Sequence, residues 1–317
     1  MANDKQLRFR QDGTFKIVQF TDVHHTSDGR NSIPTFELME EVLAKETPDL
    51  VVFTGDLIAS HGDPKPKDAI QEVTAVAEKA GIPFAVVLGN HDAEGLVPRE
   101  EMISVFDGNP YSLTEAGPDD ISGYGNYVLP IQGSAAEKPE AALYFVDSGD
   151  YAPAHIGGYD WIKRDQIEWY VRQSSALTAQ NGGNPLPSLA FFHIPLPEYD
   201  EVWNSHACRG VKYEEVCSPK INSGFFTALV EMGDVMGTFA GHDHVNDYNG
   251  EFHGIRLCYG RATGYNTYGR EGFPRGARII QLQEGQRGFD SWLRLADGSI
   301  VQEQPEHLPA GRVLSEA

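Results

Sequence analysis

Cysteine is scarce in this sequence, which contains only three: Cys208, Cys217 and Cys258. Three cysteines are too few for a disulfide framework, and their spacing does not fit a cysteine-based metal site. An oxidising compartment would allow one bridge between Cys208 and Cys217. Buried free thiols are the favoured interpretation.

Long apolar runs are also missing. No stretch approaches the roughly 20 consecutive apolar residues that a membrane-spanning helix requires. The first residues, Met1 to Gln6, contain no apolar core of an export signal. We therefore expect no membrane partner and a cytoplasmic location, unless an export signal has already been removed.

Basic residues are outnumbered, with 25 Lys and Arg against 46 Asp and Glu and a net charge of −21. Such a surface repels the phosphate backbone of nucleic acids, which we therefore exclude as partners. A small phosphate ester remains acceptable, because a local pair of cations outweighs distant, screened surface charge. Composition leaves the oligomeric state open.

What the sequence does contain is a repeated pattern, in which a short apolar segment runs into metal-binding side chains. Residues 50–53, Leu-Val-Val-Phe, are typical of a strand buried on both faces, and Asp56 follows them. Four other segments lead to further polar groups: Asp22 and His24; Asn90, His91 and Asp92; His193; and His242, Asp243 and His244. Ligands of α/β sheets lie beyond the carboxyl ends of the strands, so we predict that all five segments converge on one metal centre.

Helical patterns alternate with the first three of these strands, over Thr35–Glu46 and Asp68–Ala80, and predict an α/β sheet covered by helices. Further helices are expected at Glu100–Phe106, Asp160–Ala176 and Gly224–Met232. Residues 195–222 are expected to form a long loop, which in a compact domain is more often a functional lid than idle chain.

Four other expectations concern strands and domains. Residues 7–20 are expected to form a hairpin, and residues 127–131 are expected to pair with 142–147. Strands at 248–252, 255–259, 278–282 and 291–295 are expected to form a second sheet. The motifs are spread from Asp22 to His244, so we predict one domain over residues 1–303 and a loosely attached tail over 304–317.

The residue types favour a pair of cations. Two ions ~3.5–4 Å apart need a bridging carboxylate with oxygen and imidazole ligands on either side. Asp56 suits the bridge, because its side chain is short and it follows Gly55. Each motif alone has an ordinary explanation as a turn, helix cap or satisfied histidine. Five motifs at five strand ends make coincidence very improbable.

Taken together, these motifs resemble those of the calcineurin-like metallophosphoesterases. The resemblance covers most of the chain, and the stretches around His193, His242 and Cys258 are similar to the branch that contains the yeast Dcr2 phosphatase and the short plant purple acid phosphatases. It implies a four-layer α/β/β/α sandwich of two mixed sheets. It also implies a set of metal ligands: Asp22, His24, Asp56 and His244 for one ion, and Asp56, Asn90, His193 and His242 for the other.

One position departs from the purple acid phosphatases, which carry a tyrosine three residues after the bridging aspartate. Ala59 occupies that position here, so we expect no purple chromophore. Two divalent or mixed-valence transition metal ions are implied, and iron, manganese and zinc all remain open.

The function implied is hydrolysis of phosphate esters, monoesters being favoured, by a metal-activated hydroxide that attacks phosphorus in line. Asp56, Asn90 and His91 are the expected catalytic residues, with His91 beside the scissile phosphate. Asn90 and His91 would stabilise charge on the phosphoryl oxygens, or His91 would protonate the leaving alkoxide. The alternatives are hydrolysis of small diesters and a non-catalytic scaffold protein with this fold.

Five residues near the motifs have a predicted role, and four of them also have an alternative. His25 either points into the site or faces solvent, and His61 either lines the pocket or lies on the surface. Arg261 and Tyr265 are predicted to hold the phosphate or the leaving group, and the alternative for Arg261 is a structural salt bridge. Asp92 either orients a neighbouring histidine or stabilises its own turn.

Overall fold

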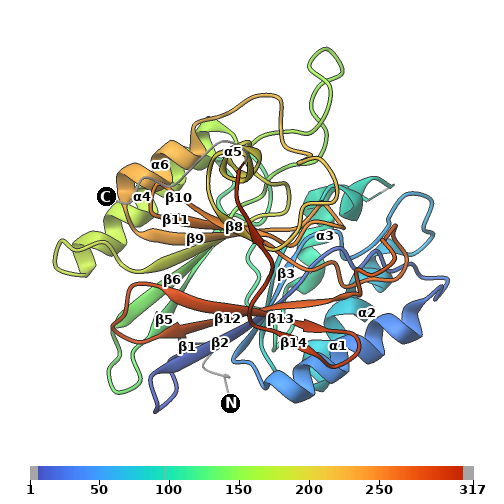
Figure 1. Ribbon diagram of the computed structural model, residues 1–317, viewed down its shortest axis with the longest axis horizontal. Helices are drawn as coiled ribbons and strands as arrows, with labels where there is room; N and C mark the ends of the chain where they lie inside the picture. Colours follow the sequence, from blue (N-terminus) through green and yellow to red (C-terminus); the bar gives the residue numbers. More distant parts are fainter. Residues whose placement is uncertain (1–5, 96, 310–317) are drawn as a thin grey trace.

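The computed structural model describes residues 6–95 and 97–309. Two mixed β-sheets pack face to face at the centre of the molecule, and helices cover the outer face of each (Figure 1). This α/β/β/α order of layers confirms the predicted fold class. It follows from the alternation of apolar strands with amphipathic helices, since each sheet buries one face on the other sheet and one on helices.

The six-stranded sheet contains the first three of the predicted motif-bearing strands. Its order is β14 (Ile300–Val301), β13 (Phe289–Leu295), β12 (Gly276–Gln283), β2 (Thr14–Phe20), β3 (Leu50–Thr54) and β4 (Phe84–Val87). Strands β2, β3 and β4 run parallel, and β12 pairs antiparallel with β2. Helices α1 (Ser32–Glu46) and α2 (Pro66–Lys79) connect the parallel strands and lie on the outer face of this sheet (Figure 1).

The nine-stranded sheet contains the other two motif-bearing strands, β7 and β9. Its order is β1 (Leu7–Arg8), β5 (Tyr127–Gln132), β6 (Pro139–Phe145), β7 (Ser188–Phe191), β9 (Val235–Ala240), β11 (Ile255–Tyr259), β10 (Asn249–Phe252), β8 (Cys208–Arg209) and β15 (Glu306–His307). The outer face carries α4 (Arg164–Gln180), α5 (Glu198–Ser205) and α6 (Phe225–Met232). Shorter helical segments are η1 (His91–Ala93), α3 (Arg99–Ile103) and η2 (Ser104–Phe106).

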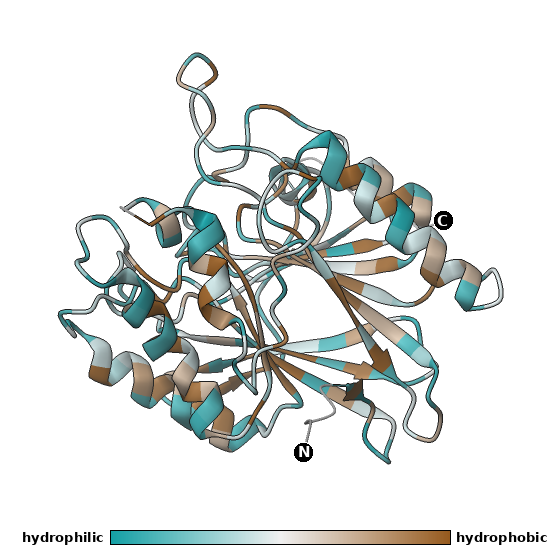
Figure 2. Ribbon diagram, turned by 180° about the vertical axis from the view of Figure 1, so that it is seen from behind, coloured by the Kyte–Doolittle hydropathy of each residue, from teal (hydrophilic) through white to brown (hydrophobic). Residues whose placement is uncertain are grey.

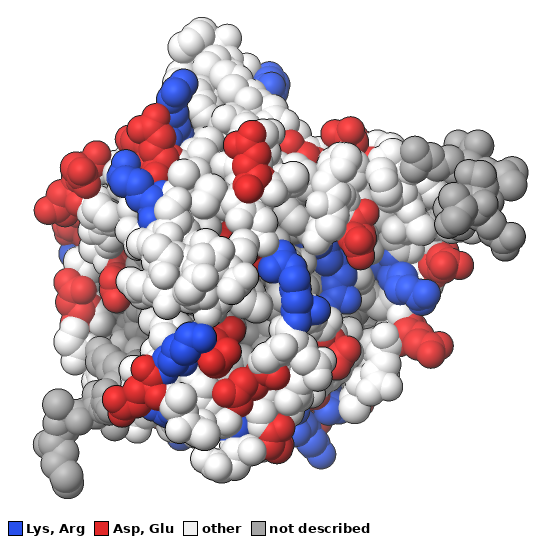
Figure 3. Space-filling model, turned by 90° about the vertical axis from the view of Figure 1, so that its left-hand side faces the viewer, with Lys and Arg blue, Asp and Glu red and all other residues white. Residues whose placement is uncertain are grey.

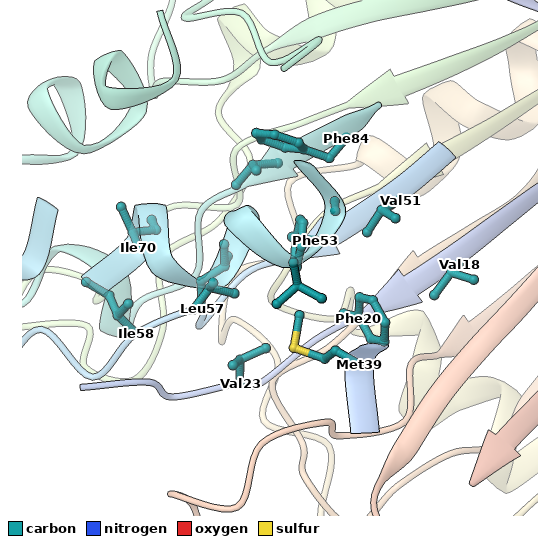
Figure 4. Packing of buried hydrophobic residues seen from close by; sticks show 14 of the residues in the cluster. Val18, Phe20, Val23, Met39, Val51, Phe53, Leu57, Ile58, Ile70 and Phe84 are labelled. Atoms are coloured by element: carbon teal, nitrogen blue, oxygen red, sulfur yellow. The ribbon is translucent and has the colours of Figure 1, made fainter. Parts of the chain in front are cut away.

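Apolar side chains fill the three spaces between the four layers. In the space beneath α1 and α2, the rings of Phe20 and Phe84 each pack on Phe53, with centroids 5.9 and 6.1 Å away (Figure 4). All five residues of β3 are buried, because that strand is covered on both faces. Figure 2 shows the apolar stretches concentrated along the strands, while the helices are polar over much of their surface.

The predicted hairpin over residues 7–20 is wrong. The backbone does turn there, and Arg10 N donates to Thr14 O at 2.9 Å. The two flanking strands, however, join different sheets: Leu7 is paired in parallel with Ile131, while β2 lies between β12 and β3. Apolar alternation identifies each strand but does not identify its partner. The predicted pairing of residues 127–131 with 142–147 is confirmed by β5 and β6.

The predicted second sheet of four C-terminal strands is also wrong. β10 and β11 extend the nine-stranded sheet through the parallel pairing of β11 with β9. β12 and β13 instead extend the six-stranded sheet through β2. The pairing of β12 with β2 joins segments more than 250 residues apart, which a local pattern does not encode.

Residues 195–222 are not one long loop, because they contain α5 and β8. Tyr199 and Val202 of α5 are fully buried against the nine-stranded sheet. A helix this short is not stable by itself, so this packing stabilises it. The predicted helix over residues 160–176 begins later, at Arg164. Lys163 N donates to Gln166 Oε1 at 2.6 Å, and this contact fixes the start of the helix.

The tail is attached at least as far as the structure describes it. β15 pairs antiparallel with β8, and the ring of His307 stacks on Trp203 with centroids 3.7 Å apart. Gln304 Nε2 donates to Asp247 O at 3.1 Å. The prediction of a loose tail is therefore wrong for residues 304–309. The edge of β8 has backbone groups that need partners, and β15 supplies them. Residues 310–317 lie outside the described residues.

Figure 3 shows acidic and basic side chains interspersed on the face it presents. All three cysteines are free; Cys208 and Cys258 are buried, and Cys217 is partly exposed. No helix within residues 6–95 and 97–309 is both long enough and apolar enough to cross a bilayer.

Candidate metal centre

The five motif-bearing strands, β2, β3 and β4 of one sheet and β7 and β9 of the other, lead their polar side chains to one place. Asp22 and His24 follow β2, Asp56 follows β3, His193 follows β7, and His242 and His244 follow β9. These six side chains come together as two groups of potential ligands, confirming that the motifs converge. Their donor atoms come from both sheets, so the centre exists only when the two sheets pack together.

Asp56 belongs to both groups. The first consists of Asp22, His24, Asp56 and His244, and the second of Asp56, His193 and His242; within each group the donor atoms lie within 4.8 Å of one another. Asp56 Oδ2 lies 3.6 Å from His24 Nε2 and 3.1 Å from His193 Nε2. One carboxylate thus stands between two sets of imidazoles, which is the arrangement that a bridging ligand requires.

The remaining short distances also join candidate ligand atoms. His244 Nε2 lies 3.4 Å from Asp22 Oδ1 and 3.2 Å from His24 Nε2. His242 Nδ1 lies 3.3 Å from His193 Nε2. All six side chains are buried, none with more than 7% of its surface exposed. Imidazole nitrogens that face each other in a buried site need a proton or a cation between them.

Three buried atoms at the centre have no hydrogen-bond partner: Asp56 Oδ2, Asn90 Oδ1 and His242 Nε2. A buried polar atom left unpaired costs about 1–3 kcal/mol, and native proteins rarely tolerate several in one place. Carboxylate oxygen, amide oxygen and imidazole nitrogen are donors that first-row transition metals accept. The residues therefore fit a pair of such ions.

Comparison with known proteins agrees with this geometry. A family model described as calcineurin-like phosphoesterase matches residues 15–246. The chain belongs to this family. This membership identifies the chain as a phosphoesterase, and the two ligand groups agree with a dinuclear metal site.

Two relatives and one solved structure illustrate the similarity. The phosphoesterase is 38% identical to "Probable inactive purple acid phosphatase 29" of Arabidopsis thaliana, over 92% of this chain and 82% of that protein. It is 34% identical to "Phosphatase DCR2" of Saccharomyces cerevisiae, over 92% of this chain and 55% of that protein. A dimetal phosphatase from Danio rerio shares the fold, with a TM-score of 0.57, 14% identity, and coverage of 87% of this chain and 98% of that one.

Strained backbone positions the ligands of this phosphoesterase. Apart from glycine, seven of the described residues have positive φ, and four of them are candidate ligands: Asp22 at 53°, His24 at 50°, Asp56 at 49° and His242 at 77°. The left-handed conformation costs such residues roughly 1–2 kcal/mol each. Strain of this kind collects at functional sites, where the surrounding structure holds it in place.

Close approach to Asp56 requires glycine at position 89. A Cβ added to Gly89 would lie 2.1 Å from Asp56 Oδ1 and 2.4 Å from Asp56 N. The glycine after β4 thus lets the ends of β3 and β4 lie close enough to share the site. The sequence motif Gly-Asn-His-Asp contains this glycine, and the structure gives the reason for it.

Hydrogen bonds outside the ligand groups orient two of the imidazoles. His193 Nδ1 lies 2.8 Å from Thr54 O, which directs His193 Nε2 toward Asp56. His244 Nδ1 lies 2.6 Å from Thr267 Oγ1, which directs His244 Nε2 toward Asp22. Such partners fix the ring orientation and tautomer of a ligand histidine. Nothing in the sequence pattern identified Thr54 or Thr267.

Burial and charge prepare the ligands to bind cations. Burial lowers the pKa of both His24 and His242 to about 3, so their nitrogens are unprotonated at neutral pH. Burial would raise the pKa of Asp22, but the hydrogen bond and charge of His244 lower it to about 2. Burial acts against protonation of His193, but the carboxylate of Asp56 raises the pKa of this histidine to about 9. A cation binding there therefore displaces a proton.

His91 lies at the exposed border of the centre, with 36% of its side chain exposed. Its ring centroid is 5.1 Å from that of His24, and its backbone N donates to Asp56 Oδ1 at 2.8 Å. His91 Nδ1 lies 2.6 Å from Glu94 Oε2. Burial lowers the pKa of His91, but Asp56 and Glu94 outweigh it and raise the pKa above the usual value.

Two residues near His91 were missed in the sequence. Glu94 lies three positions after His91, a spacing that brings side chains together on a helical turn and could have been noticed. Tyr151 comes from a distant loop; its hydroxyl accepts a hydrogen bond from Asn90 Nδ2 at 3.2 Å and donates to Glu94. No local signal connects Tyr151 to the motif of Asn90.

Three of the five residues near the motifs, His25, Arg261 and Asp92, have structural roles. His25 Nε2 lies 2.7 Å from Glu72 Oε2 and its other nitrogen contacts Ser32, so the ring is buried against α1 and α2 instead of the centre or the solvent. Arg261 forms a buried ion pair with Asp247. Asp92 accepts hydrogen bonds from the backbone of Ile58 and Gly89, which favours the turn-stabilising reading.

The other two residues are exposed. His61 lines a cavity of about 510 Å³ between the loop that follows His25 and the loop that follows Asp56. Ala59 lines the same cavity and has no ligand atom in its side chain. Tyr265 is 37% exposed and lies in the same loop as Thr267.

Proposed function

We propose that this chain hydrolyses phosphate monoesters at a dinuclear centre. Asp22, His24, Asp56 and His244 would hold one ion, and Asp56, Asn90, His193 and His242 the other. The observation that carries the proposal is the shared Asp56, whose buried Oδ2 lies between the two groups of imidazoles, 3.6 Å from His24 Nε2 and 3.1 Å from His193 Nε2. When bound, the two cations polarise the phosphoryl group and lower the pKa of water toward neutrality.

The protein itself contributes groups around the phosphate. Attack on phosphorus in line places developing charge on the phosphoryl oxygens and on the leaving alkoxide. His91 is the group at the exposed border of the centre, where its imidazole would donate a proton or a hydrogen bond to either oxygen. The amide of Asn90 is oriented by Tyr151, so its Oδ1 remains free as a ligand.

Positive charge at the centre favours monoesters over diesters. A monoester carries two negative charges near neutral pH, whereas a diester carries one. A pair of cations, with the ring of His91 at its exposed border, suits the more highly charged substrate. Hydrolysis of small diesters is the alternative that the assay below separates.

The types of ligand atom also indicate which metals the centre would bind. Imidazole nitrogens mixed with carboxylates suit iron, manganese or zinc better than magnesium or calcium, which prefer oxygen ligands alone. We therefore expect two transition metal ions per chain, without a purple colour, because Ala59 supplies no phenolate.

The test combines elemental analysis with hydrolysis of p-nitrophenyl phosphate and bis(p-nitrophenyl) phosphate, before and after the metal is removed and restored. We expect two ions per chain and metal-dependent hydrolysis of the monoester at the higher kcat/KM. Faster hydrolysis of the diester would favour the diesterase. Uptake of two ions without hydrolysis of either ester would favour the non-catalytic scaffold, and the absence of metal uptake would rule out the centre.

A further inference from the structure

A pair of stacked tyrosines lies beside the candidate metal centre. The ring of Tyr159 meets His242 edge to face, with centroids 4.2 Å apart and planes at 89°. Tyr151 stacks on Tyr159, with centroids 5.8 Å apart and planes at 27°. Tyr151 is the outer ring of the pair and is 46% exposed. The aromatic surface thus continues outward from a candidate ligand to solvent.

Hydrogen bonds hold Tyr151 next to the groups that would surround the phosphate. Its hydroxyl accepts from Asn90 Nδ2 and donates to Glu94 Oε1. The other oxygen of Glu94 lies 2.6 Å from His91 Nδ1. One carboxylate therefore connects Tyr151 to His91.

The loop that carries the two tyrosines is closed on itself. Tyr151 and Tyr159 are opposite each other in an antiparallel bridge. Ala152 N donates to Gly158 O at 3.0 Å, and Asp160 N donates to Asp150 O at 3.1 Å. The orientation of the Tyr151 ring is therefore set before any ligand binds, which reduces the entropy lost on binding.

Nearly half of the surface of Tyr151 is exposed, and two acidic residues contact it. Tyr159 is its one ring contact among the described residues, so the opposite face of the ring is uncovered by another ring. Glu94 and Asp150 contact Tyr151 through its hydroxyl and its backbone N–H. The carboxylate of Glu94, at the hydroxyl end of the ring, disfavours a second anionic group there.

From this geometry we propose that the alcohol part of the substrate carries an uncharged aromatic ring, which stacks on the exposed face of Tyr151 while the phosphate occupies the metal centre. The proposal rests on the proposed function and adds a substrate class to it: aryl-bearing monoesters without further phosphate groups. Tyr151 is a substrate-binding residue here, and the chemistry stays with the groups around the phosphate.

The test compares benzyl phosphate with cyclohexylmethyl phosphate, whose leaving alcohols are similar in size and basicity but differ in aromaticity. Aromatic pairs add enough binding energy to raise kcat/KM for the benzyl ester by roughly threefold to tenfold. Tyr151→Leu should remove this preference. Tyr151→Phe should keep it, because the ring remains, even if the loss of the hydroxyl lowers kcat/KM for both esters.

Tyr213→Leu is the matched control. Tyr213 is also 46% exposed, but its ring contacts Phe273 and Arg270 rather than any candidate ligand. The preference for the benzyl ester should survive in this variant. Equal kcat/KM for the two esters in the unmodified enzyme, or a preference that survives Tyr151→Leu, would overturn the proposal.

A binding measurement separates this inference from the proposed function. Benzylphosphonate and cyclohexylmethylphosphonate carry a phosphorus–carbon bond that is not hydrolysed, and calorimetry on the metal-loaded protein gives their Kd values. Tighter binding of benzylphosphonate that is lost in Tyr151→Leu supports the stacking site even if neither ester is hydrolysed. Equal Kd values for the two phosphonates count against it.

Discussion

Glu94 Oε2 lies 2.6 Å from His91 Nδ1, and Glu94 follows His91 by three residues, about one helical turn. This contact gives the exposed histidine at the border of the centre a fixed carboxylate partner. The pair fixes the ring of His91 so that Nε2 is the nitrogen left for a substrate. Several of the expected properties of the site depend on this relationship.

Replacing Glu94 with Gln should lower the pKa of His91. The carboxylate favours the imidazolium through its charge and its hydrogen bond, and the amide lacks the charge. NMR titration of the metal-free protein measures this pKa directly. An unchanged His91 pKa in Glu94→Gln would contradict the contact.

The same substitution should have a pH-dependent effect on stability. The pKa of His91 in the folded state is raised above 6.5, so the imidazolium stabilises the fold fully below that pH. This contribution is lost as the pH rises through the folded-state pKa. Glu94→Gln should therefore destabilise the metal-free protein more at about pH 6 than at about pH 9, as measured by urea denaturation.

His91→Ala should lower kcat on a monoester by about 10²-fold or more, because a positioned acid is removed from the border of the centre. Its metal content should remain at two ions per chain, since His91 is not among the grouped ligands. His253→Ala is the control: His253 is an exposed histidine in the turn between β10 and β11, at the opposite end of the sheet from the centre. Near-full turnover in His91→Ala would exclude a catalytic role for that side chain.

Removal of the metal should lower the melting temperature. A free metal concentration of a hundred times Kd adds about 2.7 kcal/mol per site to the free energy of unfolding, because the ions bind the folded state alone. Asp56→Asn should bind little of either ion, since Asp56 belongs to both ligand groups, whereas His242→Ala should keep one. The exposed Asp119→Asn should bind both ions and serves as the control. Elemental analysis and calorimetry check these numbers.

Gly89→Ala should disrupt the centre through steric overlap. The added Cβ would lie 2.1 Å from Asp56 Oδ1, so the ends of β3 and β4 must separate, at a cost of about 1–3 kcal/mol for overpacking. The stabilisation by metal should then be lost. Gly183→Ala should cost about 1–2 kcal/mol for its positive φ but retain the response to metal, because nothing lies within 4 Å of its Cβ. A Gly89→Ala protein whose melting temperature still rises with metal would contradict this account.

Local patterns predicted the strands and most of the helices, because burial imposes its periodicity on each segment separately. Leu50 to Thr54 is one example, since a strand covered on both faces has to be apolar throughout. Pairing partners were harder to predict. β1 and β2 adjoin in sequence yet join different sheets, and β12 pairs with β2 across more than 250 residues.

The sequence by itself determined the candidate ligands and their order along the chain, because metal chemistry restricts the residue types and each candidate follows an apolar strand. Only the tertiary structure decided which distant side chains surround that set, Tyr151 beside Asn90 and Thr267 behind His244, and it turned His25 toward Glu72 instead. These contacts join segments from different parts of the chain. Their geometry depends on how the two sheets pack, which no local pattern in the sequence specifies.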